Sequence, residues 1–287
     1  MRSEEKNKIE GGTLYLVATP IGNLSDMSER ALKVLSDVDF IAAEDTRNTL
    51  RMLTHFGISK PLISYFEHNK AERGEQIAQR LEGGESCALV TDAGTPAISD
   101  PGEDIVRLCA LKGIPVTSVP GACAGICALT LSALPTARFC FEGFLPQKKS
   151  DRRDRLQELA YERRTMIFHE APHKLRDTLN DFYDSFGADR RISLCRELTK
   201  LNEEVLRLTL AEAVAYYKEH EPRGEYVLVL QGGEGTKSVN AEIDMLTPQE
   251  QVELYVEQGL SKMDAIKKVA KERGVPKNDI YKLFNKD

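Results

Sequence analysis

Residues 90–102 read Val90-Thr91-Asp92-Ala93-Gly94-Thr95-Pro96-Ala97-Ile98-Ser99-Asp100-Pro101-Gly102, and this stretch decides the fold class. An apolar run from Cys87 to Val90 stops at an acidic residue, passes through a loop of small residues and prolines, and leads into the amphipathic segment 103–111. Such a strand, loop and helix bring backbone close to a ligand and place the carboxylate of Asp92 beside it. The stretch matches neither G-x-G-x-x-G nor G-x-x-x-x-G-K-[ST], so it favours a nucleotide-type pocket built on a different loop. A plain turn capped by Asp92 is the alternative.

The rest of the N-terminal half repeats this alternation of apolar runs and amphipathic segments. Strands are predicted at 13–18, 40–43, 61–66, 87–91 and 115–119, and helices at 28–38, 46–56, 71–81, 103–111 and 122–134. Continuous apolar strands separated by helices indicate a largely parallel sheet covered on both faces. Ligands bind beyond the carboxyl ends of such strands. Those ends lead into the loops 19–23, 44–47, 92–96 and 120–124, which the pattern therefore predicts to form one site.

The second half is predicted to form a mixed sheet. Strands are expected at 139–144, 165–170, 191–197, 205–209 and 225–231. The link between 191–197 and 205–209 is too short for a crossover, so these two strands are expected to form an antiparallel hairpin. The fold class is thus α/β, with an N-terminal domain at 13–134, a boundary at 134–137, a second domain at 138–235 and a Gly-rich linker at 232–242.

The last part of the chain, residues 245–287, is predicted to be a small helical module. Thr247 is expected as an N-cap, with Pro248 at the first and Glu250 at the third helical position. Helices follow at 262–273 and 278–284, with a break at Gly274-Val275-Pro276. From Gly259 onward there are eight Lys or Arg and four Asp or Glu. This pattern favours a helix-turn-helix-like nucleic-acid module as much as a solvated helical cap or dimerisation element.

Composition narrows the class of protein. The 287 residues are 41% hydrophobic and 29% charged with a net charge of −6, which is ordinary for a soluble protein. A polyanionic partner would therefore have to meet local basic patches. The six cysteines form no C-x-x-C pair, so buried cytoplasmic thiols are expected and no metal site. Prolines and glycines interrupt the apolar region 114–134, so no membrane span is expected. The leader 1–12 carries no signal-peptide core and is expected to be disordered.

Seven short motifs occur in a fixed order along the chain. They are Leu14-Tyr15-Leu16-Val17-Ala18-Thr19-Pro20-Ile21-Gly22-Asn23-Leu24, Ala43-Glu44-Asp45-Thr46-Arg47, Thr91-Asp92-Ala93-Gly94-Thr95-Pro96, Pro120-Gly121, Phe141-Glu142-Gly143-Phe144, Arg196-Glu197-Leu198-Thr199-Lys200 and Arg223-Gly224-Glu225. Together they resemble the tetrapyrrole-methylase superfamily, and within it the RsmI type, the bacterial small-subunit (16S) ribosomal RNA (cytidine-2′-O)-methyltransferases. The first three motifs make a specific combination, and the resemblance extends from about Thr13 to the C-terminus.

The resemblance implies a cofactor, a substrate and an assembly. Members have two α/β domains that bind S-adenosylmethionine in the cleft between them, usually as homodimers, and the RNA enzymes modify the small ribosomal subunit. The implied cofactor residues are Pro20, Ile21, Asp92, Gly94, Thr95, Ile98, Cys123, Ala124, Glu170 and Glu225. Cys123 would contribute backbone and no thiol chemistry. For Glu170 the alternative is an exposed side chain at a strand end.

Methyl transfer to a ribose hydroxyl requires alignment and removal of a proton. Asp45 is the hypothetical base or base-orienting group, Arg47 is assigned to a phosphate or to developing charge, and Lys200 to the hydroxyl. A purely structural Asp45–Arg47 pair that caps a helix at Thr46 is the alternative. No histidine is assigned a role.

RNA contact is predicted for a cluster of cations that follows Phe144-Leu145-Pro146. Lys148, Lys149, Arg152 and Arg153 are expected on a flexible segment at the mouth of the cleft, where they could neutralise phosphates. The alternative is a solvated helix start, although cations there oppose the helix dipole. Other functions compatible with the motifs are methylation of a tetrapyrrole, for which the basic clusters are unnecessary, diphthamide-type protein methylation, and a non-catalytic RNA-binding role in ribosome assembly.

Overall fold

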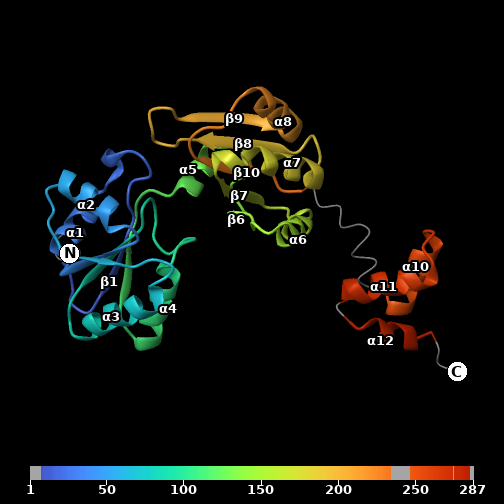
Figure 1. The fold of residues 1–287 in the computed structure, drawn as a ribbon, viewed down its shortest axis with the longest axis horizontal. Helices are drawn as coiled ribbons and strands as arrows, with labels where there is room; N and C mark the ends of the chain where they lie inside the picture. The colour runs from blue at the N-terminus through green and yellow to red at the C-terminus, as the bar shows by residue number, and fades with distance from the viewer. Residues whose placement is uncertain (1–7, 234–245, 274, 285–287) are drawn as a thin grey trace. The chain divides into compact units, whose positions relative to one another are not determined.

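The protein is described from a computed structural model that defines residues 8–233, 246–273 and 275–284. The chain divides into two compact units, Met1–Gly232 and Gly233–Asp287. The first unit contains two five-stranded sheets with their helices (Figure 1). Every strand and helix named from the sequence is found with its bounds shifted by three residues or fewer at either end, so the α/β class is confirmed.

The first sheet is entirely parallel. Its strands are β1 (Leu14–Val17), β2 (Phe40–Ala43), β3 (Leu62–Ser64), β4 (Cys87–Val90) and β5 (Val116–Val119), in the order β3-β2-β4-β1-β5. All residues of β2 and β4 are buried, as their continuous apolar runs predicted. Helices α1 (Glu29–Asp37) and α2 (Thr46–His55) cover one face, and α3 (Lys70–Glu82) and α4 (Gly102–Lys112) the other (Figure 1). A short turn, η2 (Leu24–Asp26), precedes α1.

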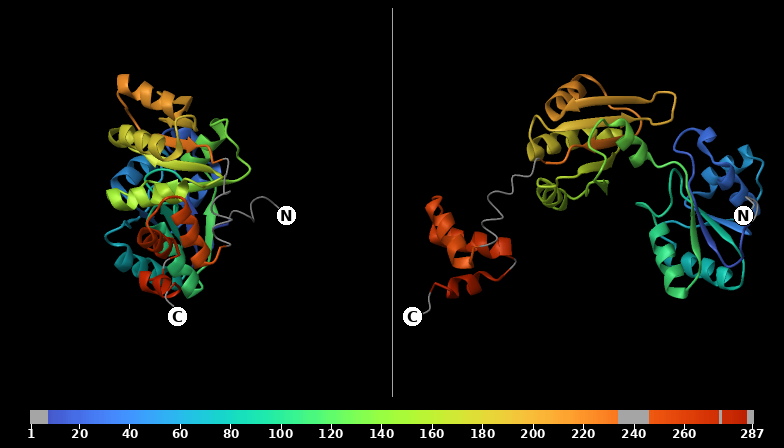
Figure 2. Two further views of the ribbon diagram at one scale, coloured as in Figure 1. Left: turned by 90° about the vertical axis from the view of Figure 1, so that its right-hand side faces the viewer. Right: turned by 180° about the vertical axis from the view of Figure 1, so that it is seen from behind.

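Helix α5 (Ala124–Leu131) follows β5 in sequence but packs on the second sheet. Its residues Ala128 and Leu129 share a buried cluster with Ile167, Cys195 and Val229 of that sheet. The views in Figures 1 and 2 both show this green helix against the strands of the second domain. The sequence assigned the helix to the N-terminal domain, so the expected boundary at 134–137 lies one helix later than the packing places it. The reason is that α5 is apolar on all sides and therefore has no face that selects one sheet.

The second sheet is mixed, as predicted. Its strands are β6 (Phe139–Gly143), β7 (Thr165–Glu170), β8 (Arg191–Arg196), β9 (Glu204–Thr209) and β10 (Tyr226–Leu230), in the order β6-β7-β10-β8-β9. Only β6 and β7 are parallel, and β8 and β9 form the predicted antiparallel hairpin. Helices α6 (Lys149–Leu159), α7 (Leu175–Phe186) and α8 (Leu210–Glu219) cover the face opposite α5, and η3 (Pro172–Lys174) leads into α7.

The basic segment 148–155 is helical and not flexible. Lys148 is the N-cap of α6, and the buried side chains of Leu156 and Leu159 fix the helix on the core of the second domain. The prediction of a flexible segment is therefore wrong. The sequence offered only these two apolar anchors, because the rest of α6 is charged or polar.

The second unit contains α10 (Pro248–Glu257), α11 (Lys262–Arg273) and α12 (Lys277–Lys282) around a small buried core. Thr247 caps α10 with the predicted capping box, since it exchanges hydrogen bonds with Glu250 in both directions. The predicted break at Gly274 and the predicted linker beyond Gly233 lie outside the described residues, as do residues 1–7 of the leader. Residues 8–12 of that leader are ordered, because Ile9 packs on the first domain. None of the described helices is long and apolar enough to span a membrane.

Candidate active site

A cavity of about 450 Å³ lies within the first unit, at the carboxyl ends of strands from both sheets. Its size is within the range of small-molecule sites. Nine of the thirteen residues proposed from the sequence for cofactor binding or catalysis line it. These are Ile21, Gly94, Thr95, Ile98, Cys123, Ala124, Glu170, Lys200 and Glu225. Pro20, Asp92, Asp45 and Arg47 are absent from the lining.

The loops after β1, β4 and β5 are joined into one wall. Thr19 and Gly94 exchange backbone hydrogen bonds, with N···O distances of 2.8 and 3.1 Å. The Thr95 hydroxyl donates to the carbonyl of Ala122 at 3.0 Å, which ties the loop after β4 to the loop after β5. Gly94 has a φ of +86°, a conformation that favours glycine. The wall is therefore held by backbone geometry, and it presents mainly small side chains to the cavity.

Asp100 organises the far end of the loop after β4. One of its carboxylate oxygens accepts from the backbone of Ala97 at 2.9 Å and of Gly102 at 2.7 Å. Burial raises the pKa of Asp100, against the effect of these two hydrogen bonds. Ala97 and Ser99 both have positive φ, so Asp100 stabilises a strained loop beside the cavity.

Asp92 lies outside the cavity in an acidic group with Glu44 and Asp45. Partial burial raises the pKa of Asp92, and the charges of Glu44 and Asp45 raise it further. Its nearest polar partner is Asn48, whose amide is 3.5 Å away. The loop turns the backbone of Ala93 and Gly94 to the cavity while the Asp92 side chain is exposed. A direct contact of Asp92 with a ligand in this cavity is thus not supported by its position.

Asp45 and Arg47 form the structural pair that was the alternative to a catalytic role. Asp45 caps α2 and accepts from the Arg47 backbone at 2.8 Å and from its guanidinium at 3.0 and 2.6 Å. The Arg47 side chain, through these hydrogen bonds, lowers the pKa of Asp45 to about 2. A carboxylate of such low basicity, directed at its own helix, is poorly suited to act as a base.

The second wall includes a buried carboxylate at the end of β7. Glu170 accepts from the backbone of Ala171 at 2.9 Å and from the hydroxyl of Thr178. That hydroxyl in turn accepts from the guanidinium of Arg152 at 2.7 Å. Glu170 is 5% exposed, so the alternative of an exposed strand-end side chain is wrong. Its carboxylate is engaged with α7 and the start of η3, and its position fixes the cavity wall at Ala171.

Lys200 stands between two carboxylates at the cavity. Its Nζ lies 3.0 Å from Glu197 Oε1 and 2.9 Å from Glu225 Oε2. Burial lowers the pKa of Lys200, but the hydrogen bonds to Glu225 and Glu197 outweigh burial and raise it. Glu197 and Thr199 both have positive φ, so this loop is strained, as is common at functional sites. A Cβ added to Gly22 would lie 2.4 Å from Lys200 Cγ, so glycine there allows the two loops to meet.

His169 is a cavity residue to which the sequence assigned no role. Its ring makes edge contacts with Phe141 and Phe144, at centroid distances of 5.3 and 5.6 Å. Burial lowers its pKa, with a smaller opposing effect of the Glu225 charge, so the imidazole is neutral near neutral pH. Its Nε2 is buried without a hydrogen-bond partner among the described residues. Such atoms are rare in native proteins, and in a cavity they point to a bound ligand.

The four cations proposed for RNA contact do not share one environment. Lys148, Lys149 and Arg153 are exposed, with Lys148 3.0 Å from Asp151. Arg152 is different, because its side chain is only 14% exposed and its Nε lies 2.5 Å from Asp181. Arg152 is therefore a structural residue, and its assignment to RNA is corrected.

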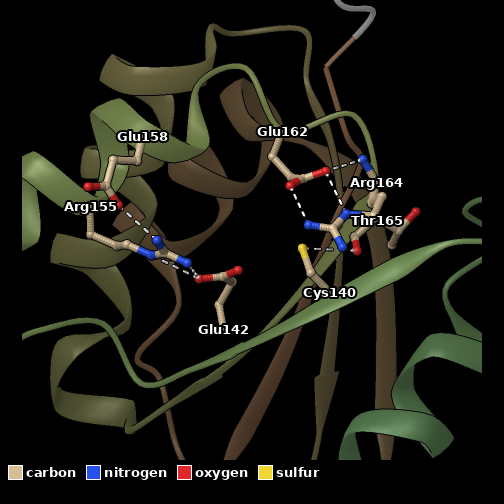
Figure 3. A network of polar contacts seen from close by, with 7 residues as sticks. All are labelled: Cys140, Glu142, Arg155, Glu158, Glu162, Arg164 and Thr165. Carbon is tan, nitrogen blue, oxygen red and sulfur yellow. Dashed lines mark hydrogen bonds and ion pairs between the residues drawn. The ribbon is translucent and has the colours of Figure 1, made fainter. Parts of the chain in front are cut away.

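Neighbouring cations are also committed to the fold. Figure 3 shows Arg155 bound to Glu142 and Glu158, and Arg164 bound to Glu162. Much of the positive charge near α6 is thus neutralised within the second domain.

Comparison with known protein families matches residues 13–214 to the Tetrapyrrole (Corrin/Porphyrin) Methylases. The chain belongs to this family. It is similar to a Halalkalibacterium halodurans protein named ribosomal RNA small subunit methyltransferase I, with 48% identity over 277 residues and 96% of both chains covered. A Synechocystis protein of the same name is 45% identical over 272 residues, which cover 95% of this chain and 97% of that protein. The resemblance found in the sequence is confirmed.

Among solved structures, this member of the family resembles uroporphyrin-III C-methyl transferase from Thermus thermophilus, complexed with S-adenyl homocysteine. The TM-score is 0.53 and the identity 17%, over 76% of this chain and 97% of that one. At this identity the likeness shows the fold alone.

The sequence missed several residues of the cavity. They include Phe141, Phe144, His169, Cys195, Glu197 and Val227. Strand periodicity could have identified His169. In β7 it lies on the same face as Ile167, which packs on α5, and on the opposite face from Phe168 and Glu170. Glu197 was quoted in a motif, but its contacts with Lys200 and with the backbone of Glu225 distinguish it from a solvated side chain, and the second of these partners is distant in the chain.

Proposed function

We propose that this protein transfers a methyl group from S-adenosylmethionine to the ribose 2′-oxygen of a cytidine in small-subunit ribosomal RNA. Small-subunit ribosomal RNA as the substrate is supported by relatives named ribosomal RNA small subunit methyltransferase I, which are 43–48% identical over nearly the whole chain. The cytidine and its 2′-oxygen come from the family resemblance. The observation that carries the proposal is the cavity, where loops of small residues face the charged group Glu197, Lys200 and Glu225.

The residues present fit such a cofactor. The backbone of Thr95, Cys123 and Ala124 offers hydrogen bonds, Gly94 allows close approach, and Ile21 with Ile98 offers apolar surface for an adenine. The group formed by Glu197, Lys200 and Glu225 has one negative charge in excess when all three are ionised. That excess suits a positively charged sulfonium. Glu170 would act through the backbone beside it, since its carboxylate is already bonded.

The bound cofactor supplies a methyl group that is already activated for attack. The protein therefore has to align the ribose hydroxyl and receive its proton. An ammonium group has three donors, and two of those on Lys200 are used by Glu197 and Glu225. The third can hold the ribose oxygen in place. Glu225 lies 2.9 Å from Lys200 Nζ and its side chain is 80% exposed, so we assign it, in place of Asp45, as the carboxylate that accepts the proton.

Phosphates of the RNA would meet the exposed start of α6. Lys148, Lys149 and Arg153 can neutralise them with loss of affinity as salt rises. The proposal includes a homodimer, as the family resemblance implies, and a cytoplasmic location, where small ribosomal subunits are found. The basic helical unit is a second place for RNA contact.

The test is methyl transfer by the purified protein. Labelled S-adenosylmethionine is supplied with small subunits from a strain that lacks the gene, and ribose methylation is located by resistance of the RNA to alkaline cleavage. One new methylated cytidine ribose is expected. Label on a tetrapyrrole and not on RNA would support the tetrapyrrole alternative, and tight binding of small subunits without any transfer would support an assembly factor.

A further inference from the structure

Phe144 is unusually exposed for an aromatic residue that lines a cavity. Its side chain is 62% exposed, more than any other large apolar residue of the described lining. Ile98, the next, is 46% exposed. Leaving an aromatic ring in water forgoes burial of a large apolar area, so an exposed ring at a cavity rim indicates contact with a partner.

The ring of Phe144 is held in place and is not a loose surface group. The next residue, Leu145, is buried in the core of the second domain. On the other side His169 makes an edge contact with the ring at an interplanar angle of 89°, and Phe141 supports His169 in the same way. A preorganised aromatic surface of this kind loses little entropy when a planar ligand stacks on it.

The chain connects this ring directly to the basic helix. Lys148 follows four residues after Phe144, so the two Cα atoms are at most about 14 Å apart even if the link is fully extended. Sites for single-stranded nucleic acids combine cations along the backbone with aromatic rings on which the bases stack. Phe144, which lines the cavity, and the exposed Lys148 and Lys149, which follow it closely in the chain, together have this combination.

We infer that Phe144 is the stacking platform for the nucleobase of the target nucleotide. This rests on the function proposed above, because it takes RNA as the substrate. The pyrimidine ring lies on the exposed face of Phe144, and the edge contact of His169 supports the Phe144 ring beneath it. The cofactor's adenine is the less fitting occupant, since a small cofactor is enclosed among the small-residue loops whereas Phe144 lies at the open rim.

The chain contains no tryptophan, so Phe144→Trp introduces a single fluorescent reporter at the platform. Stacking of a base on the indole is expected to quench its fluorescence when an RNA fragment containing the target is added. S-adenosylmethionine alone is expected to leave it nearly unchanged. Phe139→Trp is the matched control, because Phe139, the first residue of β6, is also an exposed phenylalanine but does not line the cavity.

Activity measurements complete the test. Phe144→Ala and Phe144→Leu should lower kcat/KM for small subunits roughly ten- to a hundredfold, whereas Phe144→Tyr and Phe139→Ala should stay within about threefold of wild type. The Kd for S-adenosylmethionine, measured by calorimetry, should be unchanged in all of them, which also shows that they are folded.

Four outcomes would overturn the inference. Full activity of Phe144→Leu would show that apolar bulk suffices without stacking, and a tenfold weaker Kd for the cofactor in Phe144→Ala would assign the ring to adenine. If the wild type is active and Phe144→Ala is equally active, Phe144 is not a stacking platform, while the proposed function stands. A wild type that binds cofactor but methylates no small subunit would instead refute the proposed function, and the platform with it.

Discussion

Arg152 and Arg153 are adjacent cations on α6, and we expect their replacement by serine to have opposite consequences. Arg152 makes a 2.5 Å ion pair with Asp181 and donates to Thr178 at 2.7 Å, with its side chain 14% exposed. The Arg153 side chain is 72% exposed, and within the described ranges its one ion-pair contact is with Asp154, at 3.9 Å. A hydrogen bond between charged groups contributes about 1.5–3 kcal/mol and one to a neutral group about 1 kcal/mol. Because Asp181 is 41% exposed, the lower half of that range applies.

Arg152→Ser is therefore expected to lower the free energy of unfolding by about 2–3 kcal/mol, and Arg153→Ser by less than about 0.5 kcal/mol. The loss includes the effect on Thr178, whose hydroxyl also donates to the buried Glu170. Urea unfolding followed by far-ultraviolet circular dichroism measures both variants. Equal midpoints for the two variants would refute the distinction between a structural and a surface arginine. For RNA binding, we expect the reverse order. Arg153→Ser should reduce the salt dependence of RNA binding in a protein of unchanged stability, whereas Arg152 makes no direct contribution to it.

Three other outcomes follow from the same contacts. Replacing Lys148, Lys149 and Arg153 by serine should weaken binding of the small subunit and reduce its salt dependence, at unchanged affinity for the cofactor. If filter binding shows an unchanged salt slope, the start of α6 is a solvated surface without RNA contacts. Lys200→Met should lower kcat by roughly a hundredfold or more, while the Kd for the cofactor stays within a few-fold of wild type. The control is Lys33→Met, whose kcat should stay within a few-fold of wild type. The same small effect in Lys200→Met would exclude Lys200 from catalysis. Arg164 lowers the pKa of Glu162 to about 2 from 4.5, so the pair stabilises the fold above about pH 4.5 and less as the pH falls toward 2. Glu162→Gln should then lower the thermal midpoint at neutral pH and lose most of that difference by pH 3; a difference independent of pH would contradict this.

The parallel sheet could be predicted because the sequence patterns that specify its strands and helices are local. The central strands β2 and β4 are continuous apolar runs, and the helices have apolar faces at the right period, as Ala31, Val34 and Leu35 show in α1. The carboxyl ends of such strands meet by topology, which is why the loop residues Ile21, Gly94, Thr95, Cys123 and Ala124 could be placed together.

What could not be predicted depends on partners far away in the chain. The role of Arg152 is set by Asp181, which is 29 residues later, and that of Arg155 by Glu142 on another element. The direction of the Asp92 side chain depends on how the loop after β4 is tied to Thr19, so the sequence could identify the loop but not which of its residues face the cavity.

The contacts of Lys200 change what assistance it can give to methyl transfer. A free cation would stabilise negative charge on the ribose oxygen, but Lys200 is bonded to Glu197 and Glu225, and the group as a whole is negative. Burial raises the pKa of Glu197, but the hydrogen bonds from Lys200 and from the Glu225 backbone together outweigh burial and lower it. The lysine therefore helps to keep the Glu197 carboxylate ionised, and in the proposed reaction it directs its remaining donor to the hydroxyl. In the proposed reaction the sulfonium cofactor loses its positive charge while the ribose hydroxyl loses a proton. A group with net negative charge and one hydrogen-bond donor directed at the hydroxyl suits both changes.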